Sequence, residues 1–167
     1  VLQGELLYKN EEGSLDDFME SALGSLSIAY PKFYKMDRLS KLGFLAMEGL
    51  AKDSRLMKRY TPQQVALVLS NAHASLDTDL NYYQSTKTIA SPALFVYTLT
   101  NIVTGELCIR HGIKGENAFF VFPQFDAVQV CDYVEMVMAS GKTHACVAGW
   151  VDVIGDQHDV FLYLVEK

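Results

Sequence analysis

The chain has 167 residues, of which 50% are hydrophobic and 20% are charged, and its formal net charge is −6. This composition excludes intrinsic disorder, which combines low hydrophobicity with high charge. The acidic balance would repel a phosphate backbone, so nonspecific nucleic-acid binding is disfavoured as well. The length suits one domain, and we expect residues 1–167 to form it.

The sequence contains no signal-peptide pattern and no apolar run of the roughly 18 residues that a membrane helix requires. The three cysteines, Cys108, Cys131 and Cys146, lie in apolar segments without the spacing of a metal site. We therefore expect reduced, buried thiols, no membrane association and a cytoplasmic protein.

The first part of the chain predicts a short strand and two helices. Residues 1–8 are rich in β-prone side chains and are taken as a strand. Ser14 and Asp17 have the spacing of a capping box, and apolar residues at helical spacing follow them. Pro31 ends this helix, and a second helix begins near Asp37.

The middle of the chain predicts a buried strand and a long helix. Residues 65–69 are a compact apolar run, which is typical of a central strand covered on both faces. Ser91 offers an N-cap and Pro92 a proline in the first turn. We expect the helix that follows to run to His111 and to stop at Gly112, a favourable residue after a helix end.

The last part of the chain predicts three strands and one helix. Residues 118–122 are a second buried strand, and residues 124–140 form a helix that is largely buried, because apolar positions recur around most of its surface. Residues 144–153 and 160–165 are strands joined by a short turn, which makes them antiparallel. Alternating strands and helices predict a layered α/β domain with a mostly parallel sheet.

The common catalytic motifs are missing: the sequence has no GxSxG, HExxH, paired-cysteine or phosphate-loop pattern. Among the four histidines, His73 is the most suggestive, because it follows the central strand where α/β sites collect, although a loop histidine without a chemical role is the simpler interpretation. Polar residues gather around the last hairpin: Asp152, Asp156, His158 and Asp159. Such residues are expected in a turn, so we predict neither a metal site nor a cofactor.

Residues 91–95 (SPALF) and 100–106 (TNIVTGE) resemble, in order and spacing, the helix with an asparagine and a glycine that leads to the active-site turn of the β-ketoacyl-ACP synthases. Three further segments resemble the same family. Residues 35–40 (KMDRLS) are similar to the family's RMDRFS element, which opens an early helix. Residues 112–117 (GIKGEN) are similar to the GxxGPN turn before the active-site strand, except that Glu116 stands where the family has proline. Residues 140–149 (SGKTHACVAG) are similar to the SGxxDxVLAGG element. The similarity covers roughly residues 30–153.

The resemblance implies a fold. The synthases have the thiolase fold, in which two similar halves each contain a five-stranded mixed sheet with the order β-α-β-α-β-α-β-β. The chain is therefore expected to be one such half, the N-terminal one, as a layered α/β/α structure with five strands. The two catalytic histidines and a functional lysine of the family belong to its other half and have no counterpart in these 167 residues.

The resemblance also identifies the position of the nucleophile. The family's catalytic cysteine lies seven residues beyond the asparagine of the turn, at the start of a helix whose dipole favours the thiolate. Asn117 matches that asparagine, and seven residues on stands Gln124, whose amide cannot form a thioester. Cys131 lies two turns further along the helix and cannot replace it. We expect no catalytic residue here, and a remnant pocket with four candidate residues: Asn101, Phe122, Gln124 and Phe125.

Glutamine at this position also occurs in two relatives of the synthases. The chain-length factor is an inactive partner of an active synthase. The decarboxylating loading synthase is an enzyme that retains its histidines, and these have no counterpart in the 167 residues. We therefore interpret the chain as a truncated, non-catalytic accessory or pairing protein of fatty-acid or polyketide-type biosynthesis. The alternative is a subunit of a 3-oxoacyl-ACP synthase, an acyltransferase, completed by a second chain that supplies the histidines. A stand-alone binding module is a third hypothesis.

The resemblance implies partners as well. In the family, the strand before the nucleophile pairs antiparallel with its mate in a second subunit. The matching residues are apolar at every position: Ala118, Phe119, Phe120, Val121 and Phe122. An unpaired strand edge of this kind favours strand addition. We expect a homodimer, or a heterodimer with a β-ketoacyl synthase, and an acyl carrier protein as a further partner.

Overall fold

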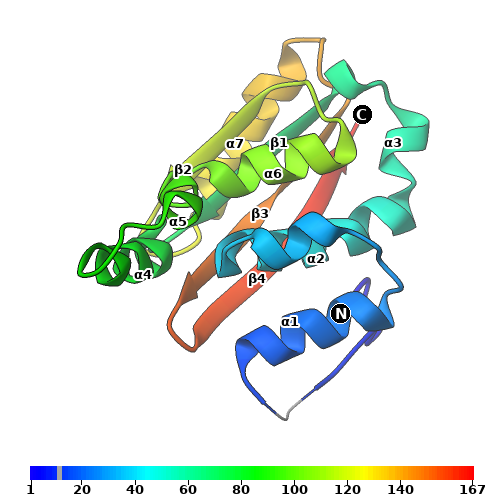
Figure 1. Cartoon of the computed structure of the whole chain (residues 1–167). Helices are drawn as coiled ribbons and strands as arrows, with labels where there is room; N and C mark the ends of the chain where they lie inside the picture. The colour runs from blue at the N-terminus through cyan, green and yellow to red at the C-terminus, as the bar shows by residue number, and fades with distance from the viewer. Residues whose placement is uncertain (11–12) are drawn as a thin grey trace.

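A four-stranded mixed sheet runs through the middle of the structure, in the order β2-β1-β3-β4. Figure 1 shows the computed structural model, which describes residues 1–10 and 13–167. The strands are β1 (Val65–Asn71), β2 (Asn117–Val121), β3 (Ala145–Ile154) and β4 (Gln157–Glu166). β1 pairs in parallel with β2 and with β3, whereas β4 is antiparallel to β3, as the short turn between them predicts.

Helices cover both faces of the sheet, so the predicted α/β/α layering is confirmed. The α-helices are α1 (Leu15–Ser25), α2 (Arg38–Ser54), α3 (Leu56–Arg59), α4 (Leu76–Thr86), α5 (Pro92–Val96), α6 (Ile102–His111) and α7 (Ala127–Ala139), and two 3-10 helices span Pro31–Lys35 and Pro62–Gln64. α2 and α6 pack on one face of the sheet and α7 on the other (Figure 1). Among the described residues, no helix combines the length and the apolar composition needed to cross a membrane.

The predicted fifth strand is absent from the described residues. Residues 1–8 contain only an isolated antiparallel bridge between Leu2 and Glu5. Gln3 and Gly4 between them have φ angles of +48° and +86°, which turn the backbone back on itself after two residues. The β-prone composition of this segment was therefore a misleading signal, because Gly4 supplies a turn that residue propensities alone do not register.

The first two long helices begin where the capping residues predict. The Asp17 N–H donates to Ser14 Oγ and the Ser14 N–H donates to Asp17 Oδ2, at 3.2 and 2.9 Å, which completes the capping box of α1. Asp37 is the N-cap of α2 and accepts from the Ser40 N–H at 3.0 Å. Its other carboxylate oxygen accepts from the Thr78 hydroxyl at 2.9 Å, which links α2 to α4.

β1 is the central strand that the apolar run predicts, and all seven of its residues are buried. Val65, Leu67 and Leu69 face α2 and α6, while Ala66 and Val68 face α7. The strand therefore contributes to the cores on both faces of the sheet.

Two helices, not one, occupy the segment 91–111. Ser91 accepts from the Leu94 N–H at 3.3 Å and Pro92 opens α5, as predicted, but α5 ends after five residues. The chain then turns at Tyr97, whose buried hydroxyl donates to Glu106 of α6 at 3.1 Å. This buried contact joins α5 to α6 at an angle, which explains why the predicted continuous helix is wrong.

The helix α4 was not predicted at all. Its sequence is polar, and Thr78 is the one residue of α4 that is fully buried. An apolar stripe is the main signal for a helix, so a segment that lacks one escapes pattern analysis.

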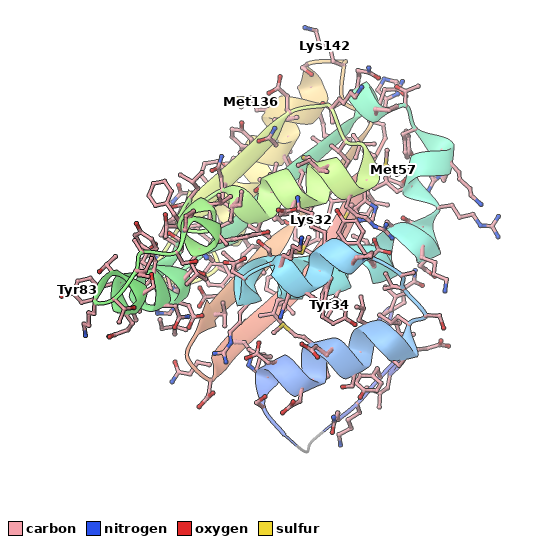
Figure 2. All side chains as sticks on the ribbon, in the orientation of Figure 1. Lys32, Tyr34, Met57, Tyr83, Met136 and Lys142 are labelled. Atoms are coloured by element: carbon pink, nitrogen blue, oxygen red, sulfur yellow. The ribbon has the colours of Figure 1, made fainter. Side chains whose placement is uncertain are left out.

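α7 is shorter and more exposed than the sequence predicts. It begins at Ala127 after Asp126, which accepts from the Gln129 N–H at 3.0 Å as an N-cap. Four of its residues are buried: Val130, Val134, Val137 and Met138. Val128 and Met136 are 70% and 59% exposed, and Met136 lies on the outer side of the helix in Figure 2. The expectation of a largely buried helix is wrong for this chain, because only one face of α7 meets the sheet.

The GIKGEN turn owes its glycines to two separate constraints. Gly112 has a φ of +67° at the end of α6, the left-handed conformation that glycine adopts most easily, so the predicted helix stop is confirmed. Gly115 passes so close to the start of β1 that a Cβ atom there would lie 2.3 Å from the Val65 carbonyl oxygen. The turn is held in place by the Lys114 N–H, which donates to the Pro62 carbonyl at 2.9 Å.

We predict that Gly115→Ala destabilises the fold by about 1–3 kcal/mol, the range expected when an atom is forced into a packed site. The matched control is Gly105→Ala in α6, where a Cβ would meet no atom within 4 Å. That substitution should stabilise the fold by about 0.5–1 kcal/mol, because alanine is the better helix former. Urea unfolding measures both. Equal stability of the two variants would contradict the close approach.

Candidate functional site

The carboxyl ends of the parallel strands bring several sequence-predicted residues to one edge of the sheet. β1 ends at Asn71 and β2 at Val121, and the Phe122 N–H donates to the Asn71 carbonyl at 2.9 Å. His73 follows β1 here, which confirms its predicted location at this edge. The loop that carries Gln124 begins at the same edge, directly after β2.

His73 is held by Asp152 from β3. The His73 Nδ1 atom lies 2.8 Å from Asp152 Oδ2, and Asp152 Oδ1 accepts from the N–H groups of Ala72 and His73, both at 3.1 Å. The His73 side chain is 37% exposed and that of Asp152 is 14% exposed. The carboxylate thus fixes the loop after β1, and this structural role fits the simpler interpretation of His73. Among the described residues, no group of three or more His, Cys, Asp and Glu side chains is arranged to hold a metal ion.

Gln124 lies in the loop between β2 and α7 and is exposed. The helix begins three residues later than the resemblance implies, because Asp126 caps it. The Gln124 amide therefore does not lie at the end of the helix dipole. Sequence analysis missed Asp126, although its spacing from Gln129, whose N–H it caps, is a recognisable N-cap signal.

Phe122 and Phe125 flank Gln124 and are both half-buried against the α7 face of the sheet. Phe122 stacks on Phe120, with ring centroids 5.6 Å apart, while Phe125 lies edge-on to Phe161 at 4.8 Å. These rings contribute to the core beneath the loop.

Asn101 completes the set of pocket candidates, but it is exposed at the start of α6. Among the described residues, no hydrogen bond or ring contact joins Asn101 to Gln124 or to the two phenylalanines. The cavities beside α1 and at the end of α2 have none of these four residues in their walls. The shared remnant pocket stays a prediction.

The cysteines do not replace the missing nucleophile. Cys146 is buried in β3, and burial raises the pKa of its thiol to about 12. Burial also raises the pKa of Cys108. Cys131 is exposed on the outer side of α7, so its predicted burial is wrong, for the same reason that α7 as a whole is more exposed. All three are free thiols.

β2 has an open edge. It lies at the end of the sheet, so only one of its two edges is paired within the described residues. The Leu67 N–H donates to the Glu116 carbonyl and the Phe122 N–H to the Asn71 carbonyl, each at 2.9 Å. Because backbone groups alternate along a strand, the N–H groups of Phe119 and Val121 point to the open edge.

The side chains of β2 are less buried than predicted. Its two end residues are exposed and its three middle residues are half-buried. The prediction of a fully buried strand is wrong for this chain, since β2 is an edge strand whose only neighbour is β1.

A second apolar surface lies on α4, α5 and the segments that follow each of them. Its exposed residues, which we call the α4–α5 surface, are Leu76, Leu80, Tyr83, Ile89, Phe95, Val96 and Leu99. Tyr83 lies at the outer end of this region in Figure 2, and α4 and α5 project from one end of the molecule in Figure 1. Exposed apolar side chains that gather on one surface commonly mark interaction sites. Sequence analysis missed this surface because it did not predict α4.

Neither the family models nor the curated proteins contain a match to this chain. Solved structures do resemble it. The ishigamide ketosynthase/chain length factor superposes with a TM-score of 0.62 at 22% identity, over 73% of this chain and 36% of that one.

Two further structures are complexes. A ketosynthase in complex with its chain length factor from Xenorhabdus doucetiae gives a TM-score of 0.57 at 16% identity, over 86% of this chain and 63% of that chain. A type II PKS acyl-carrier protein in complex with its ketosynthase gives 0.62 at 18% identity, over 80% and 39%.

These similarities establish the fold. The chain has the architecture of a ketosynthase-like domain, as the resemblance predicts, with four strands where five were expected. It spans between 36% and 63% of the length of these structures. The match covers the largest share of the other chain, 63%, in the Xenorhabdus complex.

Proposed function

We propose that this ketosynthase-like domain pairs with a ketosynthase through β2 and does not itself form an acyl-enzyme. The observation that carries the proposal is the conjunction of an open, apolar edge strand with a glutamine in the loop directly after it. The open edge of β2 is what a second strand needs for pairing. Gln124 stands where the resemblance places the nucleophilic cysteine, and a glutamine cannot carry the acyl group.

The chemistry at Gln124 supports the non-catalytic part. Covalent acylation needs a nucleophile such as a thiolate, and a carboxamide is not one. Neither Cys146, which is buried with a raised pKa, nor Cys131, which lies within α7 and beyond its first turn, offers a thiolate near the loop. A missing nucleophile prevents acylation of this loop irrespective of any histidines that a partner supplies.

The surfaces support the pairing part. The open edge of β2 exposes N–H and C=O groups that a second strand would satisfy, and an uncovered apolar edge is a liability in a protein that functions alone. The α4–α5 surface adds a large apolar area for a partner to cover. Two of the similar structures are a ketosynthase/chain length factor and a ketosynthase in complex with its chain length factor, which makes a ketosynthase the favoured partner.

An acyl carrier protein is the further partner that we propose, because one similar structure is a carrier protein in complex with its ketosynthase. The pathway would then be a polyketide-type or fatty-acid biosynthesis, and the cellular location the cytoplasm. A homodimer through the same edge of β2 is the form that the chain would take in the absence of the ketosynthase.

Val121→Pro should weaken association, with itself or with a ketosynthase, by about tenfold, because it removes an N–H that faces the open edge and costs about one hydrogen bond plus local strain. Val121 is 50% exposed, so little packing is lost. The control Val121→Thr keeps the N–H and the branched side chain and should associate normally. Light scattering of the purified proteins over a concentration series measures both. Equal association of the two variants would mean that pairing uses another surface.

Incubation of the wild-type chain with an acyl carrier protein charged with an acyl group should leave its intact mass unchanged. Gln124→Cys should give at most slow acylation and no condensation with malonyl carrier protein, because His73, the histidine at this edge, is held by Asp152 and, among the described residues, has no hydrogen bond to position 124. Mass spectrometry with peptide mapping detects either product. A rapid acyl adduct on Cys108, Cys131 or Cys146 of the wild type would overturn the non-catalytic assignment and favour the enzyme subunit.

A further inference from the structure

A basic pocket lies where α2, α3 and α6 come together at their ends. Its volume is about 500 Å³, within the range of small-molecule sites. The residues in its wall are Glu48, Ala51, Lys52, Arg55, Met57, Lys58, Arg110 and His111. Met57 lies between α3 and the end of α6 in Figure 2. The start of β1 is nearby in the fold, so the pocket is at the opposite end of that strand from Gln124.

The charge of this pocket contrasts with that of the chain. The whole chain carries 14 lysines and arginines and a net charge of −6. Four of those cations line this one pocket, together with a single carboxylate, Glu48. A concentration of positive charge on an otherwise acidic molecule creates a local potential that attracts anions.

One of the four cations in the pocket, Arg110, is paired with a carboxylate. Arg110 Nε and Nη2 donate to the two oxygens of Glu48 at 2.5 and 3.2 Å. The guanidinium also lies over the rings of Tyr30 and Phe44, at 4.7 and 5.5 Å from their centroids. Glu48 therefore balances Arg110, and no carboxylate of the described residues forms an ion pair with the remaining cations.

Those remaining cations are Lys52, Arg55 and Lys58. Within the described part of the chain, no side-chain hydrogen bond or ion pair engages any of the three. Arg55 has a φ of +52°, a left-handed conformation that asparagine or glycine adopts at lower cost. This conformation ends α2 at Arg55 and turns the chain into α3.

His111 provides a second, independent observation. Its side chain is only 10% exposed, and among the described residues its Nε2 atom has no hydrogen-bond partner. The nearest carboxylate atom, Glu48 Oε1, is 3.5 Å away and is already engaged by Arg110. Burial lowers the pKa of His111. Unsatisfied buried polar atoms are rare in native proteins, and one in the wall of a basic pocket points to a bound group.

We propose that this pocket binds a small phosphate ester through Lys52, Arg55 and Lys58. A phosphomonoester carries about −1.5 to −2 charges at pH 7 and three acceptor oxygens. It therefore suits one guanidinium and two ammonium groups better than a ligand with a single carboxylate would. The site is separate from the loop of Gln124, so it does not depend on the proposed pairing function.

The test is an NMR titration of the amide resonances with ADP, with sodium sulfate at matched ionic strength as the comparison anion. ADP should shift the resonances of residues 48–58 and 110–111 saturably. The double variant Arg55→Asn, Lys58→Gln should weaken ADP binding by about tenfold, the loss expected for one or two charge-assisted hydrogen bonds. Asparagine suits the left-handed position, so this variant should keep the fold. The matched control Lys142→Gln, an exposed lysine beyond the end of α7 (Figure 2), should bind ADP normally.

Three results would overturn the proposal. Sulfate that produces the same shifts with the same affinity would reduce the pocket to a general anion site. Poly-glutamate that binds while ADP does not would assign it to an acidic protein surface. Equal weakening by Lys142→Gln would show that only the overall charge of the molecule matters.

Discussion

The seven residues of β1 are buried on both faces and hydrogen-bonded on both edges, and the position of every functional feature follows from this strand. Because β3 occupies one edge of β1 and β2 the other, β2 is left as the end of the sheet with its outer N–H groups unpaired. Parallel pairing of β2 also places its carboxyl end beside Asn71, so the loop with Gln124 emerges next to the open edge. At the other end of β1, the close approach of Gly115 to Val65 sets where β2 can begin.

Local chemistry made much of this fold predictable. The capping box of Ser14 and Asp17, the cap at Asp37 and the stop at Gly112 involve residues a few positions apart, so the sequence itself contains the interaction. The errors arose where distant residues decide the outcome. The break between α5 and α6 depends on the contact of Tyr97 with Glu106, and the burial of α7 depends on how much of it the sheet covers.

The site was predictable to a smaller extent. Counting from Asn117 located Gln124 in the loop after β2, but the start of the helix was misjudged because Asp126 was overlooked. The grouping of Asn101 with Phe122 and Phe125 needed a tertiary arrangement that no spacing encodes. The basic pocket could not be predicted for the same reason. Lys52 and His111 are far apart in sequence, and only the packing of α2 against α6 brings them into one pocket. The resemblance supplied the fold and the pairing strand, whereas the α4–α5 surface and the basic pocket required the structure.

Residue-resolved hydrogen exchange of β2 is the most direct test of the pairing claim. In the monomeric chain, the amides of Ala118 and Phe120, which face β1, should exchange slowly, whereas those of Phe119 and Val121 should exchange rapidly. On addition of a ketosynthase from the same organism, the amides of Phe119 and Val121 should become protected. Unchanged rapid exchange of Phe119 and Val121 in a complex that has demonstrably formed would contradict the account.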